Sequence, residues 1–193
     1  MHSILIIGCG SIGERHLRCF QKTGRCEVSV CDANAKLLGE VSERYGVPSY
    51  GSLAEAVQAR RFDAWVICTP AHTHLAIARE GSAQGAALLI EKPLCASLDE
   101  AEQVLAAARQ HNCVVQVGHI EHFNPVMSYL EKHTGRPQYI TTERLAPYTP
   151  RGTEVGVVLD LMIHDIGIVL ALIKSPIAKI DSVGVDRKST RLN

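Results

Sequence analysis

The stretch ILIIGCGSIG, from Ile4 to Gly13, decides the fold of this chain. It begins with an apolar run typical of a buried strand, and glycines 8, 10 and 13 then follow at G-x-G-x-x-G spacing. The next residues have helical periodicity, and Asp32 closes the following apolar run, 19 residues after Gly13. Such a glycine pattern alone is weak evidence. Between a strand and a helix, with a later acidic residue, it predicts a dinucleotide-binding β-α-β unit.

Working outward from this unit, apolar runs alternate with amphipathic helical segments. The strand candidates are residues 4–8, 27–32, 64–69, 87–92 and 114–119. Runs that are apolar throughout are typical of strands covered on both faces. The segments between them carry helix signals, such as an N-cap serine at Ser97 and a glycine after the helix end at Gly24. This alternation predicts an α/β fold, a Rossmann-type doubly wound parallel sheet.

The rhythm changes near residue 120, where an α+β domain is predicted to begin. Helical patterns at 121–135 and 155–174 are interleaved with strand candidates at 137–145 and 178–186. We therefore predict a dinucleotide-binding domain at residues 1–118. The truncated start of a substrate and oligomerisation domain would occupy residues 119–185. The polar, aperiodic end, residues 186–193, is expected to be a non-native tail.

Composition argues against several partners and sites. The 20 basic and 20 acidic residues give a formal net charge of zero, which removes the electrostatic reason to expect nucleic acid or an anionic membrane. The seven cysteines are scattered and form no CxxC pair, as expected of reduced thiols in a cytoplasmic protein without a metal site. The apolar segment 155–173 carries ionisable groups in its middle, which argues against a membrane span.

Asp32 indicates which dinucleotide binds. A carboxylate at this position would accept hydrogen bonds from the ribose and repel a 2′-phosphate, so NAD is favoured over NADP. Gly8 would make the tight turn, Gly10 would let the backbone approach the pyrophosphate, and Gly13 would allow close packing of helix and strand. The phosphates would lie against the free N–H groups that begin the helix.

The motif DLMIHD, residues 160–165, places charged groups within an apolar helix. Asp160 and His164 are four residues apart and would share one helix face. They could be polar groups of a core helix that satisfy each other, or a base with its orienting carboxylate. Further polar clusters, TPAHTH (69–74), EKP (91–93) and GHIEHFNP (118–125), end predicted strands, where open α/β sheets bind ligands. Solvated strand ends and helix caps are the alternatives for these clusters.

In this order, GCGSIG, TPAHTH, EKPL, GHIEHFNP and DLMIHD resemble the glucose–fructose oxidoreductase/inositol dehydrogenase (Gfo/Idh/MocA) family. The resemblance implies His164 as the base, Asp160 orienting its imidazole, and Lys92 stabilising charge on the reacting oxygen. The implied cofactor contacts are Gly8, Gly10, Ser11, Ile12, Gly13, Asp32, Thr69, Pro70, His74, Glu91 and Lys92. The implied substrate contacts are Lys92, His119, Asn124, Arg144, Arg151 and His164. Related enzymes often read ERFNP and HDID where this chain has His122 and Gly167, which puts a contact expected from arginine in question.

The implied reaction is hydride transfer from a sugar carbinol to NAD. GHIEHFNP and GVVLDLMIHDI are most similar to the dehydrogenases that oxidise C3 of UDP-N-acetylglucosamine to the 3-keto sugar, which makes a nucleotide sugar the expected substrate. Another sugar or inositol dehydrogenase of the family, or a non-catalytic dinucleotide-binding protein, is the alternative. The resemblance also implies a homo-oligomer formed through a C-terminal sheet. We expect the 193-residue chain by itself to bind NAD weakly and to be inactive, because its long helix would lack that sheet.

Overall fold

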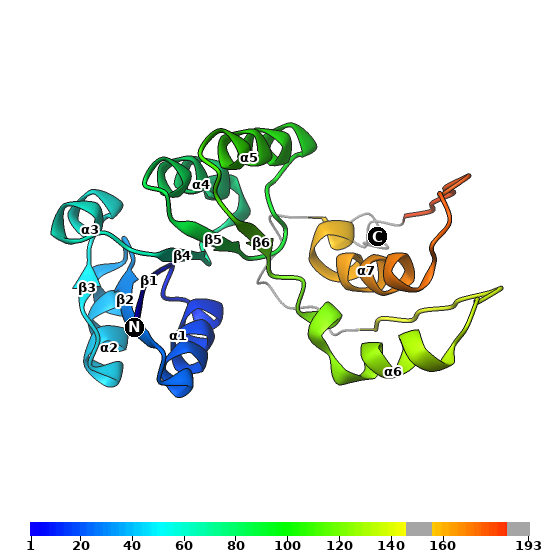
Figure 1. Cartoon of the computed structure of the whole chain (residues 1–193), viewed down its shortest axis with the longest axis horizontal. Helices are drawn as coiled ribbons and strands as arrows, with labels where there is room; N and C mark the ends of the chain where they lie inside the picture. The colour runs from blue at the N-terminus through cyan, green and yellow to red at the C-terminus, as the bar shows by residue number, and fades with distance from the viewer. Residues whose placement is uncertain (146–155, 185–193) are drawn as a thin grey trace, which may run out of the picture.

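The computed structural model describes residues 1–145 and 156–184, and a parallel sheet organises its first part (Figure 1). The strands are β1 (His2–Ile7), β2 (Cys26–Cys31), β3 (Ser49–Tyr50), β4 (Ala64–Ile67), β5 (Ala87–Ile90) and β6 (Val115–Val117). Their order is β3-β2-β1-β4-β5-β6, and every pair is parallel. The strand order therefore reverses between β1 and β4, which confirms the predicted doubly wound Rossmann fold.

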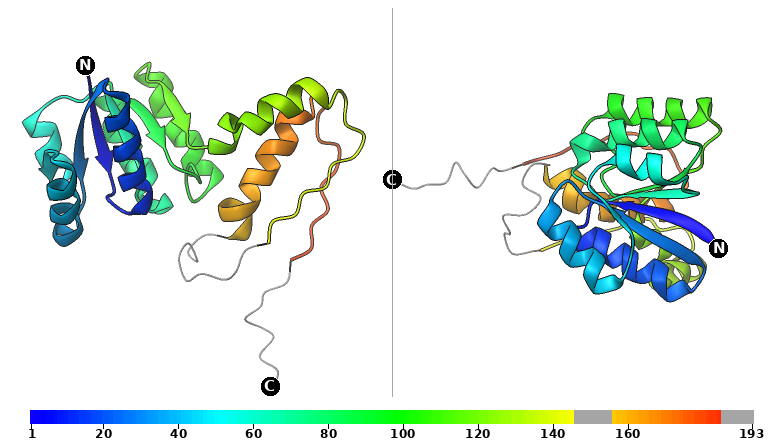
Figure 2. Two further views of the ribbon diagram at one scale, coloured as in Figure 1. Left: turned by 90° about the horizontal axis from the view of Figure 1, so that it is seen from below. Right: turned by 90° about the vertical axis from the view of Figure 1, so that its left-hand side faces the viewer.

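Helices cover both faces of this sheet (Figure 2). They are α1 (Ser11–Thr23), α2 (Ala35–Tyr45), α3 (Leu53–Ala59), α4 (His74–Ala83) and α5 (Leu98–Gln110). β1 shows why its sequence is apolar throughout. Leu5 and Ile7 join the core beneath α3, α4 and α5, whereas Ile4 and Ile6 join the core beneath α1 and α2. Successive side chains point to opposite faces, and here both faces are buried.

Local signals in the sequence account for the helix ends. The Ser97 hydroxyl accepts a hydrogen bond from the Glu100 N–H at 3.2 Å and caps α5 as predicted. Gly24 ends α1 in the left-handed conformation. The sequence missed β3, whose two residues pair with the end of β2 at the edge of the sheet. So short a strand gives no detectable period.

The chain after β6 is helical. The 3₁₀ turn η2 (Ile120–Phe123) leads into α6 (Pro125–His133), and the π-helical turn η3 (Val158–Met162) leads into α7 (Ile163–Leu172). The strand predicted at 137–145 is not formed, nor is one at 178–184, and the remainder of the second candidate lies outside the described residues. A strand needs a hydrogen-bonding neighbour, and neither segment has one among the described residues.

The two parts differ in how they bury apolar groups. The buried hydrophobic side chains lie between Ile4 and Ala108, and Met127 is the one such residue described after them. One side of η3 and α7 exposes Met162, Ile166 and Leu170, with exposed fractions of 45%, 40% and 51%. Across the described ranges, no helix has both the length and the apolar character needed to span a membrane.

Candidate active site at the carboxyl edge of the sheet

The glycine loop joins β1 to α1 at the carboxyl edge of the sheet. Gly8 has a φ of +95°, and a Cβ there would lie 2.9 Å from the Cys68 carbonyl group. A Cβ on Gly13 would collide with the Gly8 carbonyl oxygen, so helix and strand approach as closely as the sequence predicts. A Cβ on Gly10, in contrast, would meet no described atom within 4 Å. The space beside Gly10 is therefore open, as the approach of a pyrophosphate requires.

Asp32 follows β2 and faces this loop. Its Oδ2 accepts a hydrogen bond from the Cys9 N–H at 2.6 Å, and its Oδ1 accepts one from the Asn34 N–H at 2.8 Å. Ser11 and Ile12 open α1, and among the described residues no side chain caps that helix. Its first N–H groups can therefore bind an anion. Both features fit NAD, with the phosphates at α1 and a ribose at Asp32.

The loop after β4 carries the predicted cofactor contacts Thr69, Pro70 and His74. Thr69 is half-buried and Pro70 is exposed, so both are accessible to a bound cofactor. His74 is only 1% exposed, and its Nε2 lies 2.7 Å from the Thr69 carbonyl oxygen. Its Nδ1 lies 3.2 Å and 3.1 Å from the carbonyl oxygens of Pro93 and Leu94. This buried ring therefore links the loops that follow β4 and β5, and a cofactor contact of His74 stays a prediction.

Lys92 follows β5 and links the sheet to the helical part. Its ammonium group donates to Asp160 Oδ1 at 2.7 Å and to the Asp160 carbonyl oxygen at 2.9 Å. The lysine and aspartate side chains are 22% and 35% exposed. These two hydrogen bonds to Asp160 hold the ammonium group at η3, the turn that leads directly into α7 and His164.

The predicted pairing of Asp160 with His164 is corrected by this geometry. Within the described residues the Asp160 carboxylate has no hydrogen bond to the imidazole and accepts one from Lys92 instead. Asp160 lies in η3, and a π-helical turn closes its hydrogen bonds over five residues. The α-helical stacking of residues four apart, on which the prediction rested, does not apply there.

His164 lies in the first turn of α7, and its surroundings favour the neutral imidazole. Burial lowers the pKa of His164 below the ordinary value of 6.5, and the charges of Lys92 and Arg144 lower this pKa further. The carboxylates of Glu121 and Asp165 act in the opposite direction. A neutral imidazole beside a fixed ammonium group can accept a proton from a bound hydroxyl.

Two more histidines lie near this base. Burial, followed by the neighbouring His122 and His164, lowers the pKa of His119. The rings of His119 and His122 meet edge to face with centroids 6.0 Å apart. A Cβ on Gly167 would lie 3.5 Å from His122 Nε2. The two positions at which the chain departs from the ERFNP and HDID patterns are therefore neighbours in space.

Two of the remaining predicted substrate contacts, Arg144 and Asn124, have partners within the protein. Arg144 donates to both oxygens of Asp165, from Nε at 2.8 Å and from Nη2 at 3.0 Å. The Asn124 side chain caps α6 by accepting from the Val126 N–H at 3.1 Å. Arg151 lies outside the described residues. A substrate role for these three residues stays a prediction.

His16 is a member of this site that the sequence analysis missed. It lies on α1, three residues after Gly13, and its Nε2 is 2.7 Å from Glu91 Oε1. Glu91 precedes Lys92, so the helix that begins at the glycine loop is hydrogen-bonded to the EKP segment. The sequence did contain a signal for His16. A helix that starts at the glycine motif begins at the carboxyl edge of the sheet, so a polar side chain in its first turns can reach the residues that follow the other strands.

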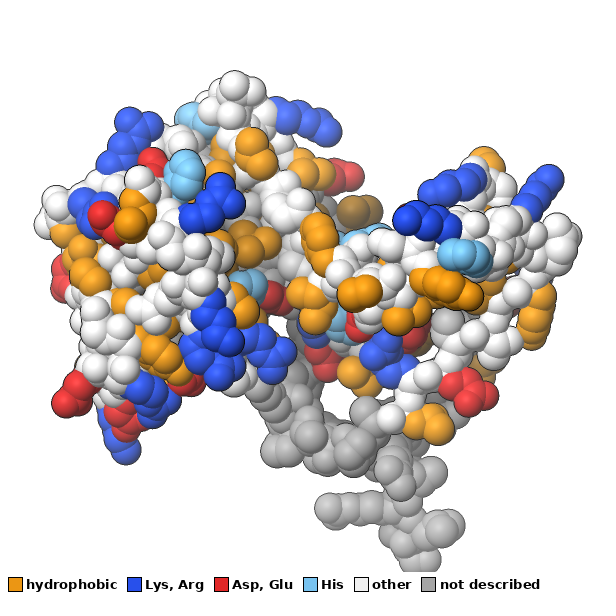
Figure 3. Space-filling model, turned by 60° about the horizontal axis from the view of Figure 1, so that its bottom comes forward, with side chains coloured by type: hydrophobic (Ala, Val, Ile, Leu, Met, Phe, Trp, Pro, Cys, Tyr) orange, Lys and Arg blue, Asp and Glu red, His pale blue; other side chains and the backbone are white. Residues whose placement is uncertain are grey.

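Figure 3 shows histidine, basic and acidic side chains gathering in the hollow between the sheet and the helical part. At the carboxyl edge of the sheet, the chain thus combines a fixed cation at Lys92, a base of lowered pKa at His164 and an open glycine loop. Such a set can remove a hydroxyl proton and stabilise the developing charge while a hydride leaves the same carbinol.

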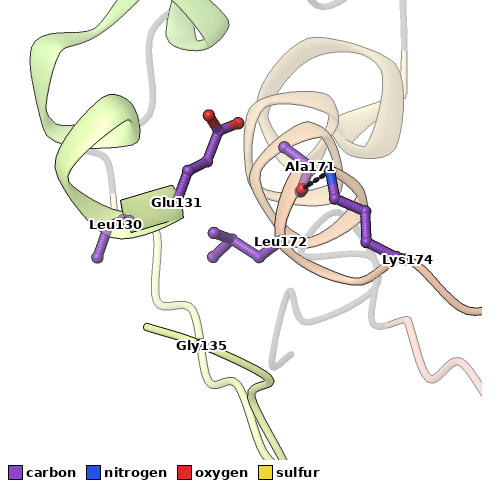
Figure 4. A pocket seen from close by; sticks show the side chains of 6 residues that line it. All are labelled: Leu130, Glu131, Gly135, Ala171, Leu172 and Lys174. Carbon is purple, nitrogen blue, oxygen red and sulfur yellow. Dashed lines mark hydrogen bonds between the residues drawn. The ribbon is translucent and has the colours of Figure 1, made fainter. Parts of the chain in front are cut away.

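A separate cavity of about 260 Å³ lies between α6 and the end of α7 (Figure 4). Its lining residues are Leu130, Glu131, Gly135, Ala171, Leu172 and Lys174. The Lys174 ammonium group donates to the Ala171 carbonyl oxygen at 2.8 Å. His164 lies in the first turn of α7, whereas this cavity adjoins the opposite end of the helix, so the cavity is not part of the candidate active site.

Comparison with known proteins gives this site a family context. Residues 2–119 match the family model described as the oxidoreductase family with an NAD-binding Rossmann fold. The UDP-N-acetylglucosamine 3-dehydrogenase of Acidithiobacillus ferrooxidans is 34% identical over 181 residues, which cover 93% of this chain and 57% of that protein. The solved structure of that enzyme matches this chain with a TM-score of 0.79, and the match covers 89% of this chain and 54% of the solved chain.

Two further proteins show the breadth of the likeness. The inositol 2-dehydrogenase of Rubrobacter xylanophilus is 29% identical over 170 residues, covering 83% of this chain and 49% of that protein. The WlbA dehydrogenase of Bordetella pertussis, solved with NADH and UDP-GlcNAcA, is 24% identical with a TM-score of 0.65 and shares the fold. It covers 69% of this chain and 42% of that chain. The chain spans about half the length of the curated relatives it matches. The chain belongs to the Gfo/Idh/MocA oxidoreductase family, and its residues 2–119 are the family's NAD-binding Rossmann fold.

Proposed function

We propose that the protein containing this chain is an NAD-dependent dehydrogenase that oxidises a sugar carbinol, most specifically C3 of UDP-N-acetylglucosamine. The observation that carries the proposal is the Lys92–Asp160 pair, which stands beside His164 at the sheet edge that also holds the glycine loop. Two of the relatives named above, one that acts on UDP-N-acetylglucosamine and one solved with UDP-GlcNAcA, support a nucleotide sugar as the substrate.

In this proposal the residues divide the chemistry among them. Lys92, held by Asp160, would donate a hydrogen bond to the reacting oxygen and stabilise its developing negative charge. His164, kept neutral by burial and by nearby positive charge, would take the hydroxyl proton. NAD, when bound, supplies the hydride acceptor. Asp160 acts on the lysine, so its role is to hold the ammonium group in place and balance its charge.

Two alternatives remain open. An inositol or another free sugar would need no diphosphate contact, and the inositol 2-dehydrogenase relative supports this reading. A non-catalytic dinucleotide-binding protein would need neither Lys92 nor His164 in this arrangement. The described residues favour catalysis, because the Lys92–Asp160 pair holds the ammonium group near His164, and NAD binding alone does not require this pair.

The test is NADH formation by the whole gene product with UDP-sugars and inositols. We expect UDP-N-acetylglucosamine to give the highest kcat/KM, and Lys92→Met to lower kcat by about 10²–10³-fold, the usual loss for one charge-stabilising donor. Lys174→Met is the matched control, since Lys174 also donates to a carbonyl oxygen of this helical part but lies at the far end of α7. Preference for an inositol would replace the proposed substrate. Equal activity of the Lys92→Met and Lys174→Met enzymes would contradict the catalytic site.

A further inference from the structure

The Glu91 carboxylate joins three elements that border the candidate site. Its Oε1 lies 2.7 Å from His16 Nε2 on α1, and its Oε2 accepts from the Lys92 N–H at 3.3 Å. Gly118, at the end of β6, lies against the same carboxylate, and a Cβ there would be 3.0 Å from Oε1. The glutamate therefore contacts the helix of the glycine loop, the segment carrying the lysine, and the neighbouring strand.

This arrangement leaves the carboxylate little freedom. The side chains of His16 and Glu91 are 20% and 15% exposed. Burial raises the pKa of Glu91, but the hydrogen bond and charge of His16, the Lys92 N–H and the Lys92 charge together bring this pKa below its ordinary value. The glutamate is therefore an ionised group whose direction is set by named partners on both sides.

The His16 contact is not needed to dock α1 on the sheet. Leu17 of that helix is fully buried, and Gly13 packs directly on the Gly8 carbonyl oxygen. The Glu14 carboxylate also accepts hydrogen bonds from Arg44 at 2.8 Å and from Tyr45 at 2.6 Å, both on α2. With the helix already held at these points, the bond from His16 is left to determine where the Glu91 carboxylate points.

We propose that His16 is a positioning residue for Lys92. Its imidazole fixes the Glu91 carboxylate, which fixes the peptide that starts Lys92 and so aims the ammonium group at Asp160. The inference rests on the proposed function for its catalytic consequence, but the position of the lysine can be measured without any substrate. A cation misplaced by about 1 Å can lower a rate by about 10²-fold, so an indirect contact can have a large effect.

The test compares four variants of the whole gene product. His16→Leu removes the hydrogen bond, and His16→Gln keeps an N–H donor at similar reach. Glu14→Gln is the matched control, because it weakens another contact of α1 that lies away from Glu91. Two readouts are taken. The first is kinetic: kcat, and KM for NAD, with a sugar that the enzyme turns over. The second is the rate at which an amine-specific reagent labels Lys92 in the absence of substrate, measured by mass spectrometry. Asp160→Asn gives the labelling rate of a lysine freed from its partner.

We expect His16→Leu to lower kcat by about 10²-fold, the scale of a small misplacement, with KM for NAD nearly unchanged. Lys92 labelling should rise towards the rate in Asp160→Asn. His16→Gln should restore most of both values, and Glu14→Gln should leave both at the wild-type level. Wild-type labelling in His16→Leu, or a His16→Gln enzyme as impaired as His16→Leu, would overturn the proposal. So would an effect confined to KM for NAD. If no sugar is turned over, the proposed function fails, while the labelling rates still decide the role of His16.

Discussion

The residues around Lys92 influence both ends of the proposed proton transfer. Asp160 balances the lysine charge and holds it in place, yet this charge still lowers the pKa of His164. Arg144 adds to that effect, and the Asp165 carboxylate that binds it works the other way. The base is thus tuned by two cations, each of which is itself paired with a carboxylate on η3 or α7.

Arg144 gives a direct test of this tuning. Replacing Arg144 by Gln removes a positive charge and frees the Asp165 carboxylate, and both changes raise the pKa of His164. A base must be unprotonated to act, so the acid limb of kcat/KM, expected below pH 6.5 in the parent enzyme, should move to higher pH. Arg136→Gln, an exposed arginine near the end of α6, is the control. An unmoved acid limb in Arg144→Gln would show that His164 is not the titrating group.

Asp32 determines the expected preference for NAD. Replacing it by Ser removes the charge that repels a 2′-phosphate, and we expect the NADP-to-NAD affinity ratio to rise at least about tenfold, or ~1.4 kcal/mol. Affinity for NAD should also fall, because the Cys9 N–H loses its acceptor. Asp63→Ser is the matched control, since Asp63 also accepts a backbone N–H of the β1 region, from Ser3. Calorimetric titration with both dinucleotides measures the ratio. An unchanged ratio would remove Asp32 from cofactor selection.

At the scale of elements, we expect two glycines of the loop to have different roles: Gly13 is needed for folding and Gly10 for cofactor binding. A Cβ on Gly13 would strike the Gly8 carbonyl oxygen, whereas a Cβ on Gly10 would point into open space. We expect Gly13→Ala to lower the free energy of unfolding by about 3 kcal/mol or more, the upper range for overpacking. Gly10→Ala should keep the parent's stability and lose affinity for NAD. Thermal unfolding and calorimetry distinguish the two. A Gly13→Ala protein as stable as the parent would refute the packing assigned to that glycine.

The sequence predicted elements well where one local pattern decides them. The five longer strands were found because their runs are largely apolar, and in β1, β2, β4 and β5 side chains on both faces pack into the buried clusters. The strand expected at 137–145 has the right alternation but no described neighbour to bond with. Strand formation depends on a partner that a linear pattern does not contain. β3 is the converse case, since two residues form a strand because β2 lies beside them.

The sequence nominated residues that the structure places near one another, but it did not predict how they pair. Lys92, Asp160 and His164 were chosen from motifs, and the structure brings the lysine to the aspartate. The expected bond between Asp160 and His164 assumed a regular α-helix, and the π-helical turn at Val158–Met162 removed that assumption. No spacing rule predicts such a turn. The buried His74 ring likewise links two loops, which the TPAHTH motif alone could not reveal.

For the whole molecule, the question is which residues the NAD site needs in order to fold. Both hydrophobic clusters of buried residues lie between Ile4 and Ala108. The helical part exposes much of the apolar side of α7 and shares with the sheet the polar contact of Lys92 with Asp160. The sequence led us to expect weak NAD binding because α7 would lack a covering sheet. The structure changes this expectation, since the cofactor loop rests on a core to which α7 contributes no fully buried side chain.

We therefore predict that residues 1–119 alone fold cooperatively and bind NAD with an affinity within severalfold of the 193-residue chain. The piece retains the glycine loop, Asp32 and Thr69 together with both clusters, and it omits the exposed apolar stripe of α7, which should reduce self-association. It loses Asp160, so Lys92 should label at the rate of a free amine. For both proteins, calorimetry with NAD measures the affinity, thermal unfolding measures cooperative folding, and sedimentation measures self-association. The same piece carrying Gly10→Ala is the control, expected to fold without binding NAD. An unfolded piece, or a folded one that has lost NAD affinity, would show that the helical part supports the cofactor site, and the Lys92–Asp160 contact would then be the first place to look for that support.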